Sequence, residues 1–183
     1  MRRSTLHKTI KALLVVTAIM LIAATTAAAQ SNTGNTTLRV GVVAEAAIVV
    51  NTSTTQLTTT GTVFNDYTGA TSFTYKVRTT KSGGSGTVTA SIASDFAGAA
   101  SGSGPKIASG DLSYLSSTGG VGSGHTSAVT AQVGSATNIL TFGANARSTK
   151  AGDTGQVNWT LVNDPQFETD TYTTTVVLTI SAS

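Results

Sequence analysis

The chain has 183 residues, a formal net charge of +3 and no cysteine. This length allows one ordinary domain. The absence of cysteine excludes disulfide bonds, thiol catalysis and cysteine-ligated zinc or iron–sulfur sites. Thr, Ser, Gly and Ala are abundant, and the long-chain helix formers Glu, Lys and Met are scarce, which argues against a helical domain.

The first 29 residues resemble a secretory signal peptide. A basic start precedes an apolar run at 12–24, and Ala27–Ala29 supplies the small-x-small pattern of a cleavage site. The run is shorter than the roughly 20 apolar residues that a bilayer span needs. We therefore expect cleavage before Gln30, a secreted or extracellular location, a place at the cell surface or in the periplasm, and no stable membrane span in the mature chain.

Cleavage changes the charge balance. The leader carries four of the 11 basic residues, which leaves seven basic against eight acidic residues in the chain from Gln30 onward, a net charge of −1. The basic isoelectric point of about 9.4 therefore belongs to the precursor. A basic face is the electrostatic footprint of nucleic-acid binding, so no nucleic-acid partner is expected.

Alternating apolar residues predict strands along the mature chain. The first region is 38–50, as one long strand or two short ones, and a weaker region follows at 56–64. The segment 71–79 alternates most clearly, with aromatic and apolar side chains on one face and Thr, Lys or Arg on the other. A Gly/Ser turn at 81–86 precedes a strand at 88–92 and predicts a hairpin with 71–79.

The second half of the chain continues this pattern after a long loop at 93–110. We expect the apolar side chains Phe96 and Ile107 of this loop to reach the core. Further strands are predicted at 112–115, 129–133, 138–142, 157–161 and 171–181. Gly134 and Ser135 separate the second and third of these, which predicts another hairpin.

Eight or nine short strands at spacings of about 8 to 15 residues predict an all-β, antiparallel, immunoglobulin-like sandwich. It forms a single domain over 30–183, of which 30–37 is a flexible lead. A closed barrel or a jelly roll is the alternative architecture.

The mature chain has few residues suited to catalysis. His125 is its one histidine and lies in a glycine-rich loop, where we expect it to be solvated. A Ser-His-Asp triad needs an ordered base, and no Gly-x-Ser-x-Gly elbow stands between a strand and a helix. We expect no catalytic residues, no cofactor and no enzyme activity; a secreted hydrolase built around His125 or the acidic residues is the remote alternative.

Two groups of residues are candidates for binding. The densest acidic group is Asp164, Glu168 and Asp170, and calcium takes oxygen ligands from loops of extracellular domains. The group lacks a D-x-D-x-D-G pattern, so an ordinary solvated loop is expected and calcium is the weaker reading. Among the aromatic residues, Tyr67 and Tyr114 are the candidates for contacts with a ligand.

The C-terminal sequence carries a resemblance to known proteins. Trp-Thr-Leu-Val-Asn-Asp-Pro at 159–165, followed by the Thr/Val-rich stretch from Tyr172, resembles the closing strands of bacterial secreted surface β-sandwiches, in particular pilin-like proteins of the spore coat protein U group. Phe96, Ile107 and the segment 112–114 are similar to the middle region of those proteins. Trp159-Thr-Leu161 also fits the W-x-L signature of wall-associated WxL domains, but the second, distal W-x-L is missing.

The pilin-like resemblance implies assembly by strand exchange, in which one subunit lends an N-terminal strand to its neighbour's sheet. Leu38, Val40 and Val42 are the strand-donation candidates, because alternate side chains of an added strand enter pockets along a sheet edge. The alternative is an ordinary first strand of a self-complete sandwich. Many pilin-type domains carry a disulfide, which this chain lacks.

These observations lead to two functional expectations. The first is a secreted or cell-surface structural or adhesive protein, such as a filament, pilus (fimbrial) or coat subunit, whose partners are further copies of itself or other surface proteins. The alternative is a secreted carbohydrate- or ligand-binding sandwich module without catalysis.

Overall fold

The computed structural model describes residues 34–61, 63–98 and 102–183. The chain divides into two units, Met1–Val40 and Gly41–Ser183. The described part of the first unit, 34–40, has no regular secondary structure and its side chains are exposed. The expected signal peptide, 1–29, and the start of the flexible lead lie outside the described residues. All strands among the described residues belong to the second unit.

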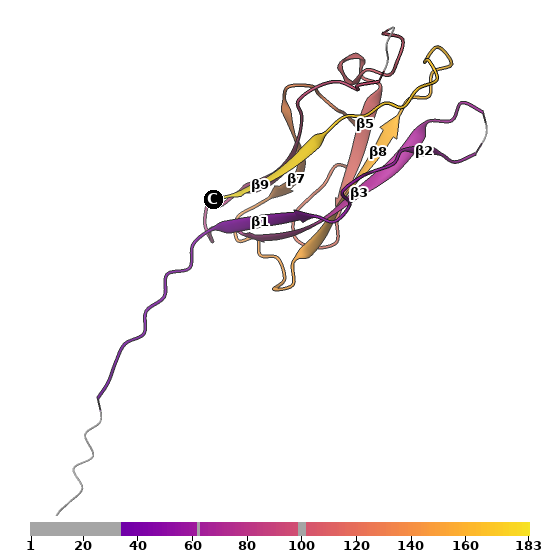
Figure 1. Cartoon of the computed structure of the whole chain (residues 1–183). Helices are drawn as coiled ribbons and strands as arrows, with labels where there is room; N and C mark the ends of the chain where they lie inside the picture. Colours follow the sequence, from indigo (N-terminus) through magenta and orange to yellow (C-terminus); the bar gives the residue numbers. More distant parts are fainter. Residues whose placement is uncertain (1–33, 62, 99–101) are drawn as a thin grey trace, which may run out of the picture. The chain divides into compact units, whose positions relative to one another are not determined.

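The second unit consists of two antiparallel sheets (Figure 1). The six-stranded sheet has the order β1 (Glu45–Val50), β3 (Tyr67–Arg78), β8 (Asp153–Leu161), β5 (Leu112–Thr118) and β6 (Val129–Thr130), with β2 (Thr58–Thr59) also paired to β3. The three-stranded sheet has the order β7 (Ala136–Phe142), β4 (Gly86–Ile92) and β9 (Val176–Ala182). The described residues contain no α-helix, and the prediction of an all-β antiparallel sandwich is confirmed.

The two-residue period decides which face of each strand enters the core. In β8, every odd-numbered residue from Asp153 to Leu161 is buried, whereas the even-numbered residues Thr154, Gln156 and Asn158 are exposed. An antiparallel sheet with one packed and one solvated face gives this pattern. The alternation of apolar and polar residues in the sequence therefore shows directly which face of the strand packs into the core.

The core lies between the two sheets and is built around aromatic residues. The rings of Tyr114 and Trp159 pack with centroids 5.5 Å apart. Their polar ends are satisfied: Tyr114 Oη donates to the Asn138 carbonyl at 2.9 Å, and Trp159 Nε1 donates to Thr71 Oγ1 at 2.9 Å. Buried Tyr and Trp need such partners, so these residues fix both the packing and the relative position of neighbouring strands.

Both predicted hairpins are wrong. β3 and β4 belong to different sheets, and so do β6 and β7, so the connections at 79–85 and 131–135 cross between the layers. At the first crossing Thr79 is buried and donates a hydrogen bond to the Gly143 carbonyl at 2.7 Å, which ties this connection to the end of β7. Turn residues predict a reversal of the chain but not whether the next strand stays in the same sheet.

The loop residues Phe96 and Ile107 reach the core, as predicted. Ile107 is buried and Phe96 packs partly against the core. The carboxylate of Asp95 accepts hydrogen bonds from the backbone N–H groups of Phe96 at 2.9 Å, Ile107 at 2.6 Å and Ala108 at 3.2 Å. These bonds join the start of the loop to the 3₁₀ turn η1 (Ile107–Ser109), which carries Ile107 into the core.

Gly155 of β8 leaves room for the ring of Phe73, its partner on the neighbouring strand β3 of the same sheet. A Cβ atom at this position of β8 would lie 2.3 Å from ring atoms of Phe73, which is fully buried. Gly155→Ala is therefore expected to lower the free energy of unfolding by about 1–3 kcal/mol, the usual effect of overpacking a core. Urea denaturation measures the change, and Gln156→Ala on the exposed face serves as control; equal effects for the two variants would contradict the packing argument.

Asp153 is a buried carboxylate at the start of β8. It accepts hydrogen bonds from the backbone N–H groups of Val121 at 2.9 Å and Thr149 at 3.0 Å. Burial raises the pKa of this carboxyl, but the hydrogen bonds favour the charged form more strongly and hold its pKa below the ordinary 3.8. The charged form therefore stabilises the fold at neutral pH, and this contribution is lost as the pH falls through the lowered pKa.

We expect Asp153→Asn to lower the free energy of unfolding at pH 7 by about 1–3 kcal/mol, because hydrogen bonds to a charged group are lost. The difference between variant and unaltered chain should shrink as the pH falls below 3.8 and through the lowered pKa of Asp153. Urea denaturation over a series of pH values from 7 downward tests this, with the exposed Asp66→Asn as control. A difference that is the same throughout the series would refute the assignment.

Candidate functional site

The two outermost strands β1 and β9 form one flank of the sandwich. β1 pairs only with β3, β9 pairs only with β4, and the two lie beside one another. In the described part of the chain no strand pairs with their outer edges. An unpaired edge presents backbone N–H and C=O groups that can accept another strand.

The strands of this flank run in opposite directions. β1 begins opposite Arg78 at the end of β3, and Ser183, just after β9, accepts a hydrogen bond from the Thr80 N–H at 3.0 Å. The start of β1 and the end of β9 therefore lie at the same end of the sandwich. A strand added at the β9 edge and antiparallel to β9 would run in the direction of β1.

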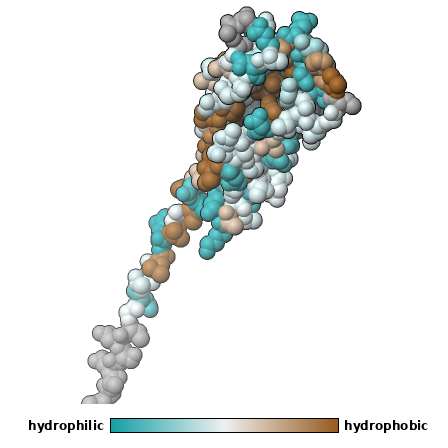
Figure 2. Space-filling view, turned by 45° about the vertical axis from the view of Figure 1, so that its right-hand side comes forward, coloured by the Kyte–Doolittle hydropathy of each residue, from teal (hydrophilic) through white to brown (hydrophobic). Residues whose placement is uncertain are grey.

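The core is incompletely covered along this flank. In β4, in the middle of its sheet, every second residue from Gly86 to Ile92 is buried. The inward-facing residues of the two edge strands are only partly buried although they pack against the same core: Ala46, Ile48, Val176, Leu178, Ile180 and Ala182. Apolar residues on the outer faces are also exposed, with Val49 at 63% and Val177 at 54%. Figure 2 shows hydrophobic residues gathered along one side of the domain.

The strand-donation candidates precede this flank in the chain. Leu38, Val40 and Val42 are 93%, 83% and 65% exposed, and residues 34–44 have no assigned strand. The prediction that the strand begins at Leu38 is therefore wrong, since β1 begins at Glu45. The apolar alternation is present in the sequence at 38–44, but this segment pairs with no strand in the described part of the chain.

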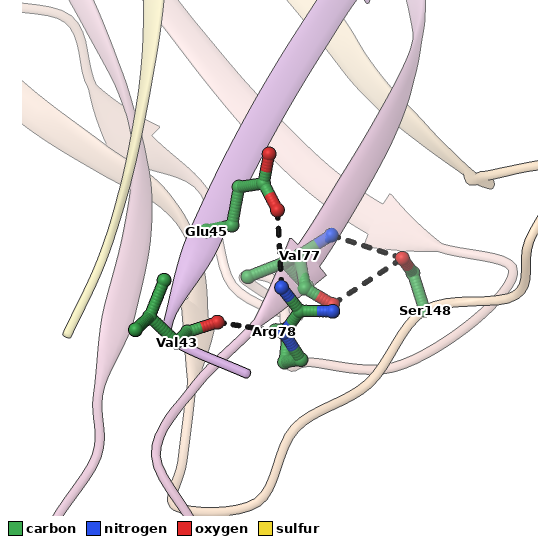
Figure 3. A network of polar contacts seen from close by, with 5 residues as sticks. All are labelled: Val43, Glu45, Val77, Arg78 and Ser148. Atoms are coloured by element: carbon green, nitrogen blue, oxygen red, sulfur yellow. Dashed lines mark hydrogen bonds and ion pairs between the residues drawn. The ribbon is translucent and has the colours of Figure 1, made fainter. Parts of the chain in front are cut away.

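Arg78 anchors the start of β1 (Figure 3). Its Nε donates to the Val43 carbonyl at 2.7 Å, and its guanidinium forms an ion pair with Glu45 at 3.0 Å. On the neighbouring residue, the Val77 N–H donates to Ser148 Oγ at 2.9 Å. These contacts fix the end of β3 on both sides, so that the chain enters β1 at a defined place directly after Val42 and Val43.

The two tyrosines singled out as ligand contacts lie elsewhere. Tyr114 is 1% exposed and belongs to the core, so the expectation of an accessible ring is wrong. Tyr114 lies on the same face of β5 as the buried Leu112 and Ser116. This alternation in the sequence is the signal that could have predicted its burial. Tyr67 is half-buried at the start of β3 and packs against the core.

Neither of two hollows formed by the described residues is lined by Tyr67 or Tyr114. One, of about 330 Å³, lies by the 3₁₀ turn and is lined by Ile107, Ala108, Ser109, Gly110, Thr130, Gln132 and Val133. The other, of about 440 Å³, lies where β1 begins and is lined by Val42, Val43, Ala44, Arg78, Thr79, Thr80, Lys81 and Arg147. The second hollow carries three cationic side chains, those of Arg78, Lys81 and Arg147.

The acidic residues at 164–170 form hydrogen bonds within their own loop. Asp164 accepts a hydrogen bond from the Gln166 N–H at 2.8 Å, and Asp170 accepts one from the Thr171 N–H at 2.7 Å. No three acidic or histidine side chains within the described ranges are grouped so as to hold a metal ion. Asp164 and Asp170 thus stabilise turns of the loop, and the weaker reading of Asp164, Glu168 and Asp170 as calcium ligands gains no support from the described residues.

His125 lies against the core rather than in open solvent. Its Nε2 is 2.8 Å from the Asn138 carbonyl oxygen, and its ring meets that of Tyr114 edge-on with centroids 6.0 Å apart. The partner of the imidazole is thus a backbone carbonyl. A catalytic base oriented for proton transfer would instead be paired with a carboxylate and a nucleophile.

Sequence reasoning missed the acceptor side of the candidate site. Leu178 and Ile180 of β9 look like any other inward-facing pair in the alternation, and Arg78 looks like an exposed strand residue. Their importance depends on which strands lie at the sheet edges, and linear spacing carries no signal for strand order.

No helix in the described portion of the chain is both long and apolar enough to cross a bilayer. Comparison of the chain with models of protein families, with curated proteins and with solved structures finds no match.

Proposed function

We propose that this protein is a secreted or cell-surface structural subunit that assembles into filaments. Each copy lends residues 38–43 to the open flank between β1 and β9 of another copy. The observation that carries this proposal is the incompletely covered core beside the unpaired edge of β9, together with an unpaired segment of matching alternation in the same chain.

The donor segment 38–43 and the open edge of β9 are complementary in backbone hydrogen bonding and in their apolar side chains. Added as a strand beside β9, the segment would form backbone hydrogen bonds with its open edge, and Leu38, Val40 and Val42 would face the partly buried Leu178 and Ile180. Fully burying a Leu or Val side chain contributes about 1.5–3 kcal/mol. Three such side chains and a row of backbone hydrogen bonds make a strong intermolecular contact.

The start of β1 favours donation to another copy. Insertion into the chain's own flank would require the backbone to reverse its direction within residues 41–44. Arg78 holds the Val43 carbonyl and the Glu45 carboxylate at this point, so a reversal would disrupt these contacts. A heterologous contact of this kind, repeated from copy to copy, generates open filaments.

Other features of the chain agree with this role. The signal-peptide pattern at 1–29 supports export, and the resemblance to pilin-like proteins of the spore coat protein U group supports assembly through strand exchange. The surroundings of His125 and the absence of a metal-binding group in the described residues give no support to catalysis. We therefore propose a structural role without enzymatic activity or cofactor.

The proposal is tested with the chain from Gln30 onward. Electron microscopy and size-exclusion chromatography are expected to show polymers, and deletion of 30–43 should leave a folded monomer, as judged by circular dichroism. A deletion variant that still polymerises would contradict strand donation. A strictly monomeric mature chain that is retained on polysaccharide would favour the ligand-binding alternative instead.

A further inference from the structure

The charges of the second unit are segregated between the two ends of the sandwich. The N-terminal pole is the end where β1 begins and β9 ends, formed by residues 41–45, 76–85, 119–128, 143–153 and 182–183. The distal pole is the opposite end, formed by 50–61, 63–67, 92–98, 102–112, 131–136 and 161–176. The strand registers place these segments together, since Tyr67 is opposite Leu161 and Leu161 is opposite Leu112, whereas Tyr75 is opposite Asp153.

Five of the six basic residues in Gly41–Ser183 lie at the N-terminal pole: Lys76, Arg78, Lys81, Arg147 and Lys150. Six of the eight acidic residues lie at the distal pole: Asp66, Asp95, Asp111, Asp164, Glu168 and Asp170. The exceptions are Glu45 and Asp153 at the N-terminal pole and Lys106 at the distal pole. Side chains alone therefore give net charges of +3 and −5.

These charges are available to a partner. Within the described residues the one ion pair joins Arg78 to Glu45. Lys81, Arg147 and Lys150 are exposed, as are Glu168 and Asp170 at the other end. Lys81 and Arg147, together with Arg78, also line the 440 Å³ hollow, so the basic pole presents a recess whose cationic rim suits an acidic loop such as 162–170.

We propose that the two poles bind one another head to tail, the basic N-terminal pole of one copy on the acidic distal pole of the next. This inference rests on the proposed strand donation for its geometry and adds the direction of the donor strand. A donor segment antiparallel to β9 runs from the N-terminal pole to the distal pole of the acceptor. The domain that follows it therefore begins at the acceptor's distal pole, so its basic N-terminal pole meets the acidic distal pole of the acceptor. A donor parallel to β9 would bring two basic poles together, and like charges repel.

The contact acts mainly on the rate of assembly and its dependence on salt. Complementary charged surfaces steer encounters and raise association rates by about 10-fold to 1,000-fold at low ionic strength. Screening shortens this attraction, because the Debye length falls from about 10 Å at 0.1 M salt to about 3 Å at 1 M. Filament elongation is therefore expected to slow at least about tenfold between 20 mM and 500 mM NaCl.

Zero-length carbodiimide cross-linking tests the contact, because it joins a carboxylate to a lysine that touches it. Isotopically light and heavy copies of the chain from Gln30 onward are mixed at 20 mM salt and the linked peptides identified by mass spectrometry. We expect links between copies that join Glu168 or Asp170 to Lys81 or Lys150. Links only between like poles, or no links between copies, would overturn the proposal.

Charge-reversed variants separate this contact from strand donation. Glu168→Lys with Asp170→Lys should remove the links and slow elongation. Adding Lys81→Glu with Lys150→Glu to the same chain should restore the links, because the exchanged side chains are again opposite in charge, but not the rate, because both poles then carry −1. Lys106→Glu, which removes the one base of the distal pole, should speed elongation. Failure of the four-residue reversal to restore the links would count against the proposal.

A chain with Leu38→Asp and Val40→Asp, which cannot donate its strand, completes the test. Links between poles should persist in it at 20 mM salt and disappear at 500 mM. Polymers of the unaltered chain that form without such links, at a rate indifferent to salt, would refute the pole-to-pole contact and leave strand donation standing. Pole-to-pole links without polymers would refute strand donation and leave the charged contact standing.

Discussion

A chain that carries both Leu38→Asp and Val40→Asp is expected to form no filaments at concentrations at which the unaltered mature chain polymerises. Each lost apolar side chain removes about 1.5–3 kcal/mol of burial, and the new carboxylates would have to be desolvated in the acceptor flank. With about 1.4 kcal/mol for each factor of ten, the concentration needed for assembly should rise at least about a hundredfold. Sedimentation velocity over a concentration series measures the shift.

The matched control places the same two substitutions on the other parity of the donor segment. Thr37→Asp with Arg39→Asp puts carboxylates on side chains that face away from the acceptor core, and these chains should assemble within about tenfold of the unaltered concentration. Both variants should unfold at the same urea concentration as the unaltered monomer, because residues 37–40 lie outside the strands. Equal effects of the two pairs on assembly would show that alternation plays no part.

Trp159→Ala is expected to cause the largest loss of stability among single substitutions in the domain. Trp159 is 4% exposed, packs on Tyr114 and donates to Thr71 Oγ1. Removing its ring leaves a cavity between the sheets and takes the partner from Thr71, at a cost of about 3–5 kcal/mol. A domain of this size is stable by about 5–15 kcal/mol, so the variant should be partly unfolded well below the temperature at which the unaltered chain melts.

Asn158→Ala is the control for this substitution, since Asn158 is the preceding residue of β8 and faces solvent. Its effect on the free energy of unfolding should stay within about 0.5 kcal/mol. Calorimetry or urea denaturation of monomeric protein measures both. If Trp159→Ala unfolded like Asn158→Ala, the placement of Trp159 in the core would be wrong.

The sequence predicts the fold class and most of the strand faces correctly for a physical reason. Alternation is a local property, so Phe73, Tyr75 and Trp159 fall on the buried side wherever their strands are placed. The loop residue Ile107 is also predicted to be buried, because a large apolar side chain in a Gly/Ser-rich loop gains most by reaching the core.

Strand order is not a local property, and the errors follow from this. The turns at 81–86 and 134–135 look like hairpin turns, but the strands that they join are in different sheets. The apolar alternation at 38–44 looks like the first part of a strand, but β1 begins only at Glu45. The second error concerns the candidate site itself: the donor residues are readable in the sequence, whereas the flank that would accept them requires the three-dimensional arrangement of β1 and β9.

The proposed strand donation can be measured most directly by disulfide cross-linking, since the chain has no cysteine of its own. Arg39→Cys is introduced in one population, and Val177→Cys, Thr179→Cys or Ser181→Cys in another, all on the outward face of the strands that would pair. Paired strands bring Cα atoms within about 4.5–5.5 Å, which a disulfide can span. Strand donation predicts a disulfide between the two populations for at least one β9 position under mild oxidation, and no such bond at any of the three would contradict it.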